Sequence, residues 1–152
     1  MHKFIVTKEL GRLAKWLRIF GFDTEYYTST NLSSLLIAAL RENRIILTRN
    51  SKIGRHAGLR ILKIESDFLA EQLREIFKEL NFPVEENKMF SRCIICNEAL
   101  RPIEKEAVRL KVPEFVYNTN NKFVTCPNCA RIYWQGTHWG NVKETIAKLS
   151  NC

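Results

Sequence analysis

The first eighty or so residues alternate short apolar runs with segments whose apolar positions recur at helical spacing. Residues 4–6, 45–48 and 60–64 have the length and composition of buried strands. Between them, leucines and alanines recur every three or four residues over 10–17 and 32–40, which predicts two amphipathic helices. Strands that alternate with helices are typical of an α/β domain with a mostly parallel sheet, so this is the fold class we expect.

Two more segments extend this pattern. The tyrosines and threonines of residues 23–28 favour a further strand. Asp67 is placed to cap a last helix, in which apolar residues from Leu69 to Leu80 face inward. Beyond that helix the pattern stops, so we expect the α/β domain to span residues 1–82.

Cysteine spacing dominates the rest of the chain, after an expected linker over residues 83–91. Four of the five cysteines form two Cys-x2-Cys pairs, Cys93 with Cys96 and Cys126 with Cys129. Each pair can place two thiolates on one turn, and two such turns complete a tetrahedral zinc site without an open position. Four reduced cysteines without a metal are the alternative, but two matched spacings rarely coincide by chance. We therefore predict a zinc ribbon over residues 92–152, with Zn(II) as its structural ion.

Composition and charge narrow the class of protein further. The 152 residues carry 24 Lys and Arg against 16 Asp and Glu, and this excess of +8 suits a polyanionic partner. No apolar run approaches the roughly 18 residues of a membrane span, and the first residues have the pattern of a strand rather than of a signal peptide. We expect a cytoplasmic protein with no membrane partner.

Clustered cations are the candidates for binding a polyanion. We expect one group on the polar face of the first helix, comprising Arg12, Lys15 and Arg18. A second group lies in the densest basic stretch, residues 41–63, and comprises Arg49, Lys52 and Arg55. A third group is aromatic as well as basic, and comprises Arg131, His138 and Trp139. Its aromatic rings could stack on unpaired bases, or they could pack the ribbon against the first domain.

Five long motifs, in a fixed order, cover nearly the whole chain. They are GRLAKWLRIFGFD (11–23), RIILTRN (44–50), ESD followed by EQLRE (65–75), RCIICNEALRPI (92–103) and CPNCARIYWQGTHW (126–139). In these motifs the chain resembles the Mut-7 C-terminal ribonuclease family, in which a PIN-like nuclease domain precedes a zinc ribbon. The resemblance implies a PIN-like α/β domain, a bound zinc ion and an ancestry in metal-dependent RNA hydrolysis.

The resemblance fails at the expected catalytic metal site. The family typically has aspartates after the first and third strands, where this chain has Thr7 and Asn50, and often has further acids where it has Ser33 and Ser34. Of the family's acids near these strand ends, Asp67 remains as the candidate catalytic residue. Neutral side chains bring no charge to offset a divalent ion, so we expect the binding of Mg(II) or Mn(II) to be severely weakened.

Three hypotheses follow. The first is an RNA-binding protein that has lost nuclease activity and docks on structured RNA, such as ribosomal RNA or tRNA, or on a ribonucleoprotein such as the ribosome. The second is an active Mg- or Mn-dependent ribonuclease that uses Asp67 and a borrowed acid, Glu9 or Glu25. The third is a protein–protein adaptor, because zinc ribbons also serve as interaction modules. Three acids converging on Thr7 and Asn50 would favour the enzyme.

Overall fold

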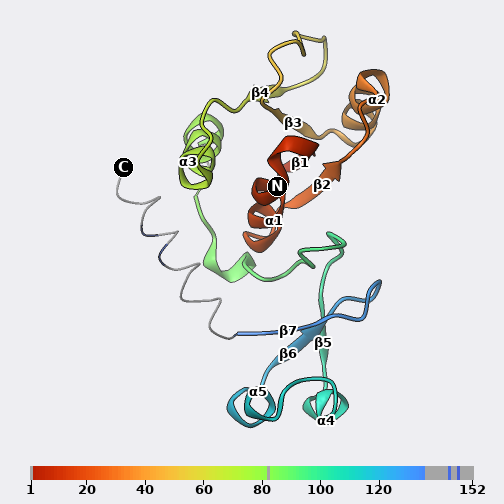
Figure 1. Ribbon diagram of the computed structural model, residues 1–152, viewed down its shortest axis with the longest axis vertical. Helices are drawn as coiled ribbons and strands as arrows, with labels where there is room; N and C mark the ends of the chain where they lie inside the picture. The colour runs from red at the N-terminus through yellow and green to blue at the C-terminus, as the bar shows by residue number, and fades with distance from the viewer. Residues whose placement is uncertain (1, 82, 136–143, 145–146, 148–152) are drawn as a thin grey trace.

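A four-stranded sheet organises the first part of the chain (Figure 1). The computed structural model describes residues 2–81, 83–135, 144 and 147. The strands lie in the order β2-β1-β3-β4, and each neighbouring pair is parallel. Their bounds are Lys3–Thr7 for β1, Asp23–Tyr27 for β2, Ile45–Thr48 for β3 and Ile61–Lys63 for β4. The predicted parallel sheet is confirmed.

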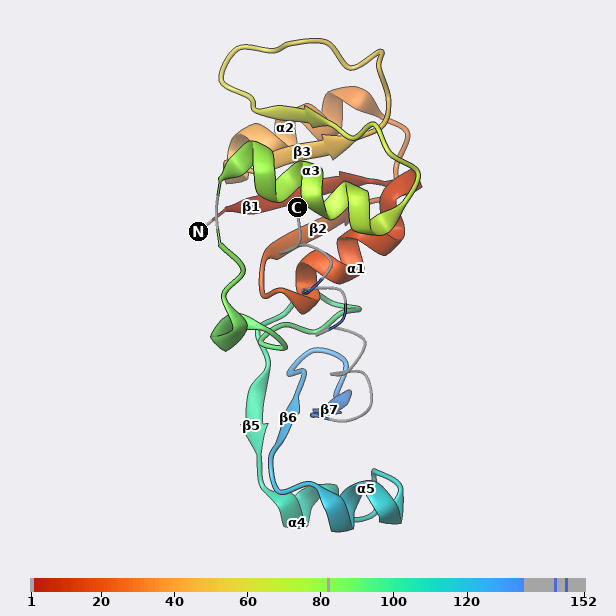
Figure 2. The same cartoon turned by 90° about the vertical axis from the view of Figure 1, so that its left-hand side faces the viewer.

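Helices cover both faces of this sheet (Figures 1 and 2). Side chains alternate between the two faces of a strand, so Phe4 and Val6 pack on one face and Ile5 on the other. The helices α1 and α3 share the first core, and α2 shares the second. Their bounds are Gly11–Ile19 for α1, Leu32–Glu42 for α2 and Leu69–Leu80 for α3. A short 3-10 helix, η1 at Lys8–Leu10, precedes α1. The predicted α/β architecture is therefore confirmed, and none of the described helices could cross a membrane.

The start of α3 differs from the prediction that Asp67 caps it. The N-cap residue is Phe68, and no side chain caps the helix. Asp67 lies one residue too early, and its carboxylate instead pairs with Arg49. The nearby Ser66 hydroxyl accepts a hydrogen bond from the Phe68 backbone N–H at 3.1 Å. The capping prediction is wrong, because an ion pair with a cation after β3 orients this carboxylate.

Residues 83–91 pack against the first core. They include the 3-10 helix η2 at Glu86–Lys88, and Met89 is buried in the same cluster as Phe4. The Phe90 backbone N–H donates to the Ile19 carbonyl at 2.9 Å. At Gly21, φ is +92° and a Cβ atom would lie 2.3 Å from the Lys88 carbonyl oxygen, so only glycine fits here. These contacts fix where the C-terminal part begins.

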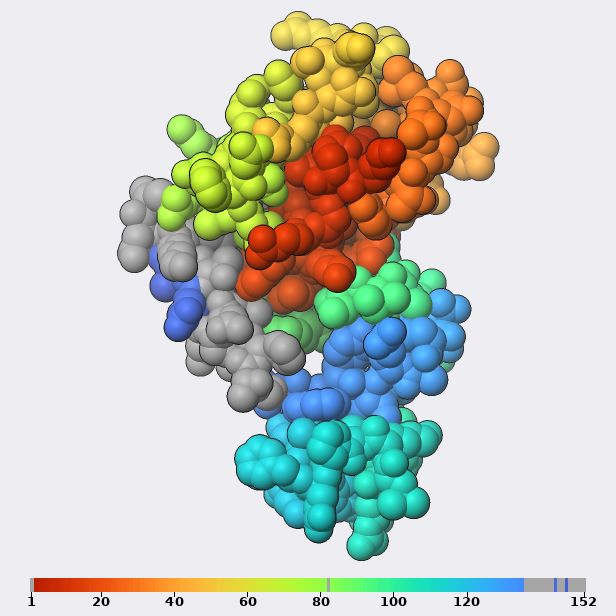
Figure 3. Space-filling model, viewed as in Figure 1, coloured from red at the N-terminus to blue at the C-terminus, as the bar shows by residue number. Residues whose placement is uncertain are grey.

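A three-stranded antiparallel sheet forms the C-terminal part, which extends away from the first part in the space-filling view (Figure 3). Within the predicted ribbon, β6, Phe123–Thr125, and β7, Ile132–Trp134, form a hairpin. Three further elements were not predicted: β5 at Arg101–Ile103, α4 at Lys105–Val108 and α5 at Glu114–Thr119. They enclose a small core around Val108, Val112 and Phe123.

Candidate functional site

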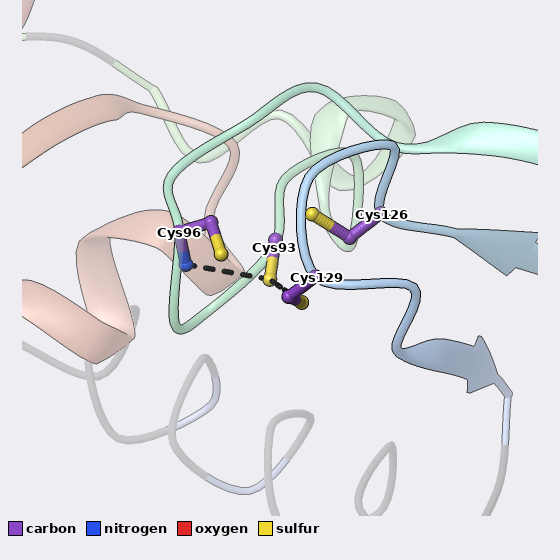
Figure 4. Close-up of side chains that lie close together, drawn as sticks. All are labelled: Cys93, Cys96, Cys126 and Cys129. Atoms are coloured by element: carbon purple, nitrogen blue, oxygen red, sulfur yellow. Dashed lines mark hydrogen bonds between the residues drawn. The ribbon is translucent and has the colours of Figure 1, made fainter.

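The two Cys-x2-Cys pairs lie on turns of the same form. In the first turn the Asn97 backbone N–H donates to the Cys93 carbonyl, and in the second the Ala130 N–H donates to the Cys126 carbonyl, both at 2.9 Å. Asn97 and Ala130 each follow the second cysteine of their pair and adopt left-handed backbone, with φ of 65° and 61°. Two equivalent turns therefore face each other with their thiols between them (Figure 4).

The four thiols fit the geometry of a tetrahedral metal site. Their Sγ atoms all lie within 4.8 Å of one another, and Cys93 Sγ is 3.8 Å from Cys129 Sγ. A tetrahedron with Zn–S bonds of about 2.3 Å has sulfur–sulfur edges of about 3.8 Å. All four are free cysteines, Cys93 and Cys126 being buried. As predicted, the structure brings Cys93, Cys96, Cys126 and Cys129 together, and they could hold a structural zinc ion.

Hydrogen bonds around this cluster favour the thiolate form of Cys93. Its Sγ lies 3.1 Å from the Tyr133 hydroxyl and 3.4 Å from the Cys96 backbone N–H. Burial raises the pKa of Cys93, but these donors outweigh it and lower the pKa to about 7. The Asn128 amide similarly donates to Cys96 Sγ at 3.2 Å. The cluster therefore has donors placed to support metal-binding thiolates.

Arg18 joins the first cysteine turn to the first domain. Its side chain is buried, at 8% exposure. Its Nη1 donates to the carbonyls of Ile94 at 2.8 Å and Ile95 at 3.1 Å, and its Nε donates to the Thr24 carbonyl at 2.9 Å. Burial lowers the pKa of Arg18, and the charges of Cys93 and Cys96 oppose this lowering. The guanidinium thus lies where it offsets negative charge on the cluster.

The prediction that Arg18 belongs to an exposed RNA-binding face is therefore wrong. A residue four positions after another lies on nearly the same side of a helix, and Arg18 follows the buried Ala14 by four positions. Arg12 and Lys15 on the same helix are exposed, as expected.

Asn97 makes a second connection between the two parts. Its Oδ1 accepts from the Thr24 backbone N–H at 2.9 Å, and its Nδ2 donates to Asp23 Oδ1 at 2.7 Å. Asp23 also accepts from Arg44 at 2.8 Å. Burial raises the pKa of Asp23, but the hydrogen bonds from Arg44 and Asn97 outweigh it, so the pKa lies below its ordinary value. This chain of contacts joins the metal-site turn to the sheet.

The strand ends where the family's aspartates would lie form a small cavity. We call it the strand-end cavity; its volume is about 170 Å³, and both Thr7 and Asn50 line it. Most of its other polar side chains are hydroxyls and amides, from Ser29, Thr30, Asn31 and Thr48. Lys8 and Glu9 also line it, and Glu9 is the one acid among the described residues around it. Thr7 and Asn50 thus lie together, as their places after parallel strands predicted.

Glu9 is held in this cavity by its own neighbours. Its Oε1 lies 2.6 Å from Thr7 Oγ1, 3.2 Å from Thr48 Oγ1 and 3.1 Å from the Arg49 backbone nitrogen. Partial loss of hydration raises the pKa of Glu9, but these donors outweigh it and lower the pKa below its ordinary value. Of the two borrowed acids considered, Glu9 therefore reaches the strand ends. Glu25 lies 3.6 Å from the Arg44 guanidinium and does not line the cavity.

None of the other candidate residues that the structure describes lines the strand-end cavity. Asp67 is mostly exposed, pairs with Arg49 and is not among the residues that line the strand-end cavity. Lys52, Arg55 and Arg131 are exposed. His138 and Trp139 lie outside the described residues. Trp134 is half-buried against the ribbon core, and together with Tyr133 and Arg131 it lines a cavity of about 570 Å³.

Sequence reasoning missed two residues: Asn97, which bonds the first cysteine turn to β2, and Tyr133, whose hydroxyl contacts Cys93. A signal for Asn97 existed, because asparagine directly after a Cys-x2-Cys pair suits the left-handed backbone there. No comparable signal marked the Tyr133 hydroxyl, whose contact with Cys93 depends on how β7 folds back.

Comparison with known proteins agrees with this geometry. A family model described as the Mut7-C RNAse domain matches residues 2–146, which supports a nuclease-like or RNA-related role. A search of the curated proteins finds no match. A search of the solved structures finds none either. Because the family match covers nearly the entire chain and its expected parallel sheet and cysteine cluster are both present, the chain belongs to the Mut7-C RNase domain family.

Proposed function

We propose that this chain binds RNA without cleaving it, and that it docks on structured RNA, such as ribosomal RNA or tRNA, or on a ribonucleoprotein such as the ribosome. The observation that carries the proposal is the strand-end cavity, where the described residues supply one carboxylate, Glu9. The formal excess of +8 supports a polyanionic partner. We place this role in the cytoplasm, where thiols stay reduced for metal binding.

A hydrolytic metal site needs more negative charge than this cavity has. Mg(II) and Mn(II) are held mainly by carboxylates, which let the ion polarise a phosphate and activate a water molecule. Thr7 and Asn50 are neutral, and Glu9 Oε1 is already surrounded by three hydrogen-bond donors. Within the described ranges, no three acids converge anywhere; the four cysteines form the one potential metal-binding group. Asp67 points to Arg49, a cation, rather than to this cavity.

We also propose that the metal of the cysteine cluster is Zn(II). Four thiolates at tetrahedral spacing are typical of structural zinc, and they leave no position for a substrate. The residues that would hold it are Cys93, Cys96, Cys126 and Cys129. Its role would be to stabilise the ribbon, whose own apolar core is small.

The first test is cleavage. The unmodified protein should hydrolyse RNA no faster with millimolar Mn(II) than without metal, because its cavity lacks the charge to hold the ion. The double substitution Thr7→Asp and Asn50→Asp should surround Glu9 with two added carboxylates and raise Mn(II) affinity, which titration calorimetry can measure. Asn118→Asp with Thr119→Asp makes the same changes at exposed positions of the ribbon and should leave Mn(II) binding unchanged. Metal-dependent cleavage by the unmodified protein, abolished by Asp67→Asn, would instead identify an active ribonuclease.

The second test is the dependence of RNA binding on salt. Lys and Arg that neutralise phosphates release counterions, so affinity should fall steeply as salt rises. Alanine at Arg49, Lys52 and Arg55 should reduce the slope of log affinity against log salt by about 2, since each lost phosphate contact contributes about 0.7 on a single strand. The matched control places alanine at Lys3, Arg60 and Lys78, three exposed cations at the end of the first part opposite the C-terminal ends of the strands. This variant should keep the slope of the unmodified protein. Equal slopes for the two triple variants would show that the proposed surface is wrong.

A further inference from the structure

One oxygen of the Glu9 carboxylate is held by hydrogen bonds, and the other is available to a ligand. Thr7, Thr48 and the Arg49 backbone N–H all bond Oε1. Within the described part of the chain, Oε2 makes no hydrogen bond to another residue, and the Glu9 side chain is exposed enough for a ligand to reach it. Three donors on one oxygen orient the group, so the cavity presents a positioned acceptor rather than a mobile surface acid.

The negative charge of the Glu9 carboxylate limits which chemical groups can bind to it. A carboxylate accepts hydrogen bonds and repels a phosphate, so its partner in a polyanion must be a neutral donor. On RNA the ribose 2′-hydroxyl is such a donor, and a glutamate or aspartate is a recurring partner of ribose hydroxyls in nucleotide sites. Hydroxyls and amides from Ser29, Thr30, Asn31 and Asn50 around it can both donate and accept.

Size and flanking charge agree with a sugar rather than a bare ion. The cavity of about 170 Å³ has room for several water molecules, and therefore for a ribose. Lys8 lines it, and the exposed Lys52 bonds through its backbone N–H to the Asn50 side chain at 2.9 Å. Lys8 and Lys52 therefore start from backbone at the cavity, and their long side chains can reach the phosphates on either side of a bound ribose.

We propose that Glu9 accepts a hydrogen bond from a ribose 2′-hydroxyl in the strand-end cavity, and that this contact makes the protein select RNA over DNA. The inference rests on the proposed RNA-binding function and names the group that the former nuclease site recognises. The 2′-hydroxyl is the group by which a protein distinguishes the two nucleic acids at a given position.

The test compares one hairpin with an unpaired loop in three forms: RNA, DNA of the same sequence, and 2′-O-methyl RNA. A hydrogen bond to a charged group is consistent with a preference for RNA of about tenfold to a hundredfold. Glu9→Ala should abolish this preference by weakening RNA binding, while DNA binding is kept or slightly strengthened because a negative charge is lost. Glu79→Ala, which removes the same charge from the exposed surface of α3, should keep the preference. Thermal unfolding of both variants checks that the fold is intact.

The outcomes separate this inference from the function on which it rests. Equal affinity of the unmodified protein for RNA, DNA and 2′-O-methyl RNA overturns the role of Glu9 and leaves RNA binding intact. An equal loss of RNA and DNA affinity in Glu9→Ala also overturns it, because Glu9 would then only support the fold. Absence of binding to any of the three hairpins overturns both proposals.

Discussion

Serine in place of Cys93 should unfold the ribbon while the parallel sheet stays folded. The ribbon core around Val108, Val112 and Phe123 is small, so most of its folding free energy must come from the metal. Binding of structural zinc supplies on the order of 10 kcal/mol in comparable small sites. The first part has two cores of its own on either face of the sheet and does not depend on the cluster in this way.

Metal analysis and circular dichroism measure this result together. The unmodified protein should contain one zinc ion per chain, and Cys93→Ser should contain little and lose part of its strand signal. Cys152→Ser is the matched control, because Cys152 belongs to neither Cys-x2-Cys pair. A zinc-free preparation with a folded ribbon would contradict the prediction. Another metal bound at the four cysteines would show that the ion is not zinc.

The second large effect should come from Arg18→Met. Methionine keeps much of the length of the side chain but leaves the carbonyls of Thr24, Ile94 and Ile95 without their donor. Buried acceptors without partners cost about 1–3 kcal/mol each, and with partial access of water we expect a total loss of about 3 kcal/mol in the free energy of unfolding. The cluster also loses a nearby positive charge, so zinc should leave faster when a chelator is added.

Urea unfolding followed by tryptophan fluorescence measures the stability change, and a colorimetric chelator measures the release of zinc. Arg12→Met is the matched control, since Arg12 lies on the same helix but is exposed. It should change the free energy of unfolding by less than about 0.5 kcal/mol. If the two variants have the same stability and the same rate of zinc release, Arg18 does not join the turn to the sheet.

The elements that the sequence predicted well are those with a strong local pattern. Phe4, Ile5 and Val6 are buried because a central parallel strand has both faces covered, and such a strand has an unmistakable apolar run. The cysteine pairs were equally clear, because metal geometry restricts their spacing. The missed elements, β5, α4 and α5, are only three to six residues long and depend on the core that they enclose.

The candidate site was predicted only in part, because its contacts join residues far apart in the sequence. The neutrality of Thr7 and Asn50 could be read directly, but the position of Glu9 depends on how η1 turns after β1. Arg18 was misassigned because a charged residue on a helix is usually exposed. Two of its three acceptors, the carbonyls of Ile94 and Ile95, lie more than seventy residues away.

The contacts of Thr24 have a consequence for association between molecules. β2 is the outermost strand on its side of the sheet, and such strands readily pair with a strand from another chain. Here Asn97 of the metal-site turn occupies the Thr24 backbone N–H and Arg18 of α1 occupies its carbonyl, so the middle of this edge is not open to strand addition. Loss of the metal-site turn would open it, and the protein would then be prone to edge-to-edge aggregation while its own sheet was still folded.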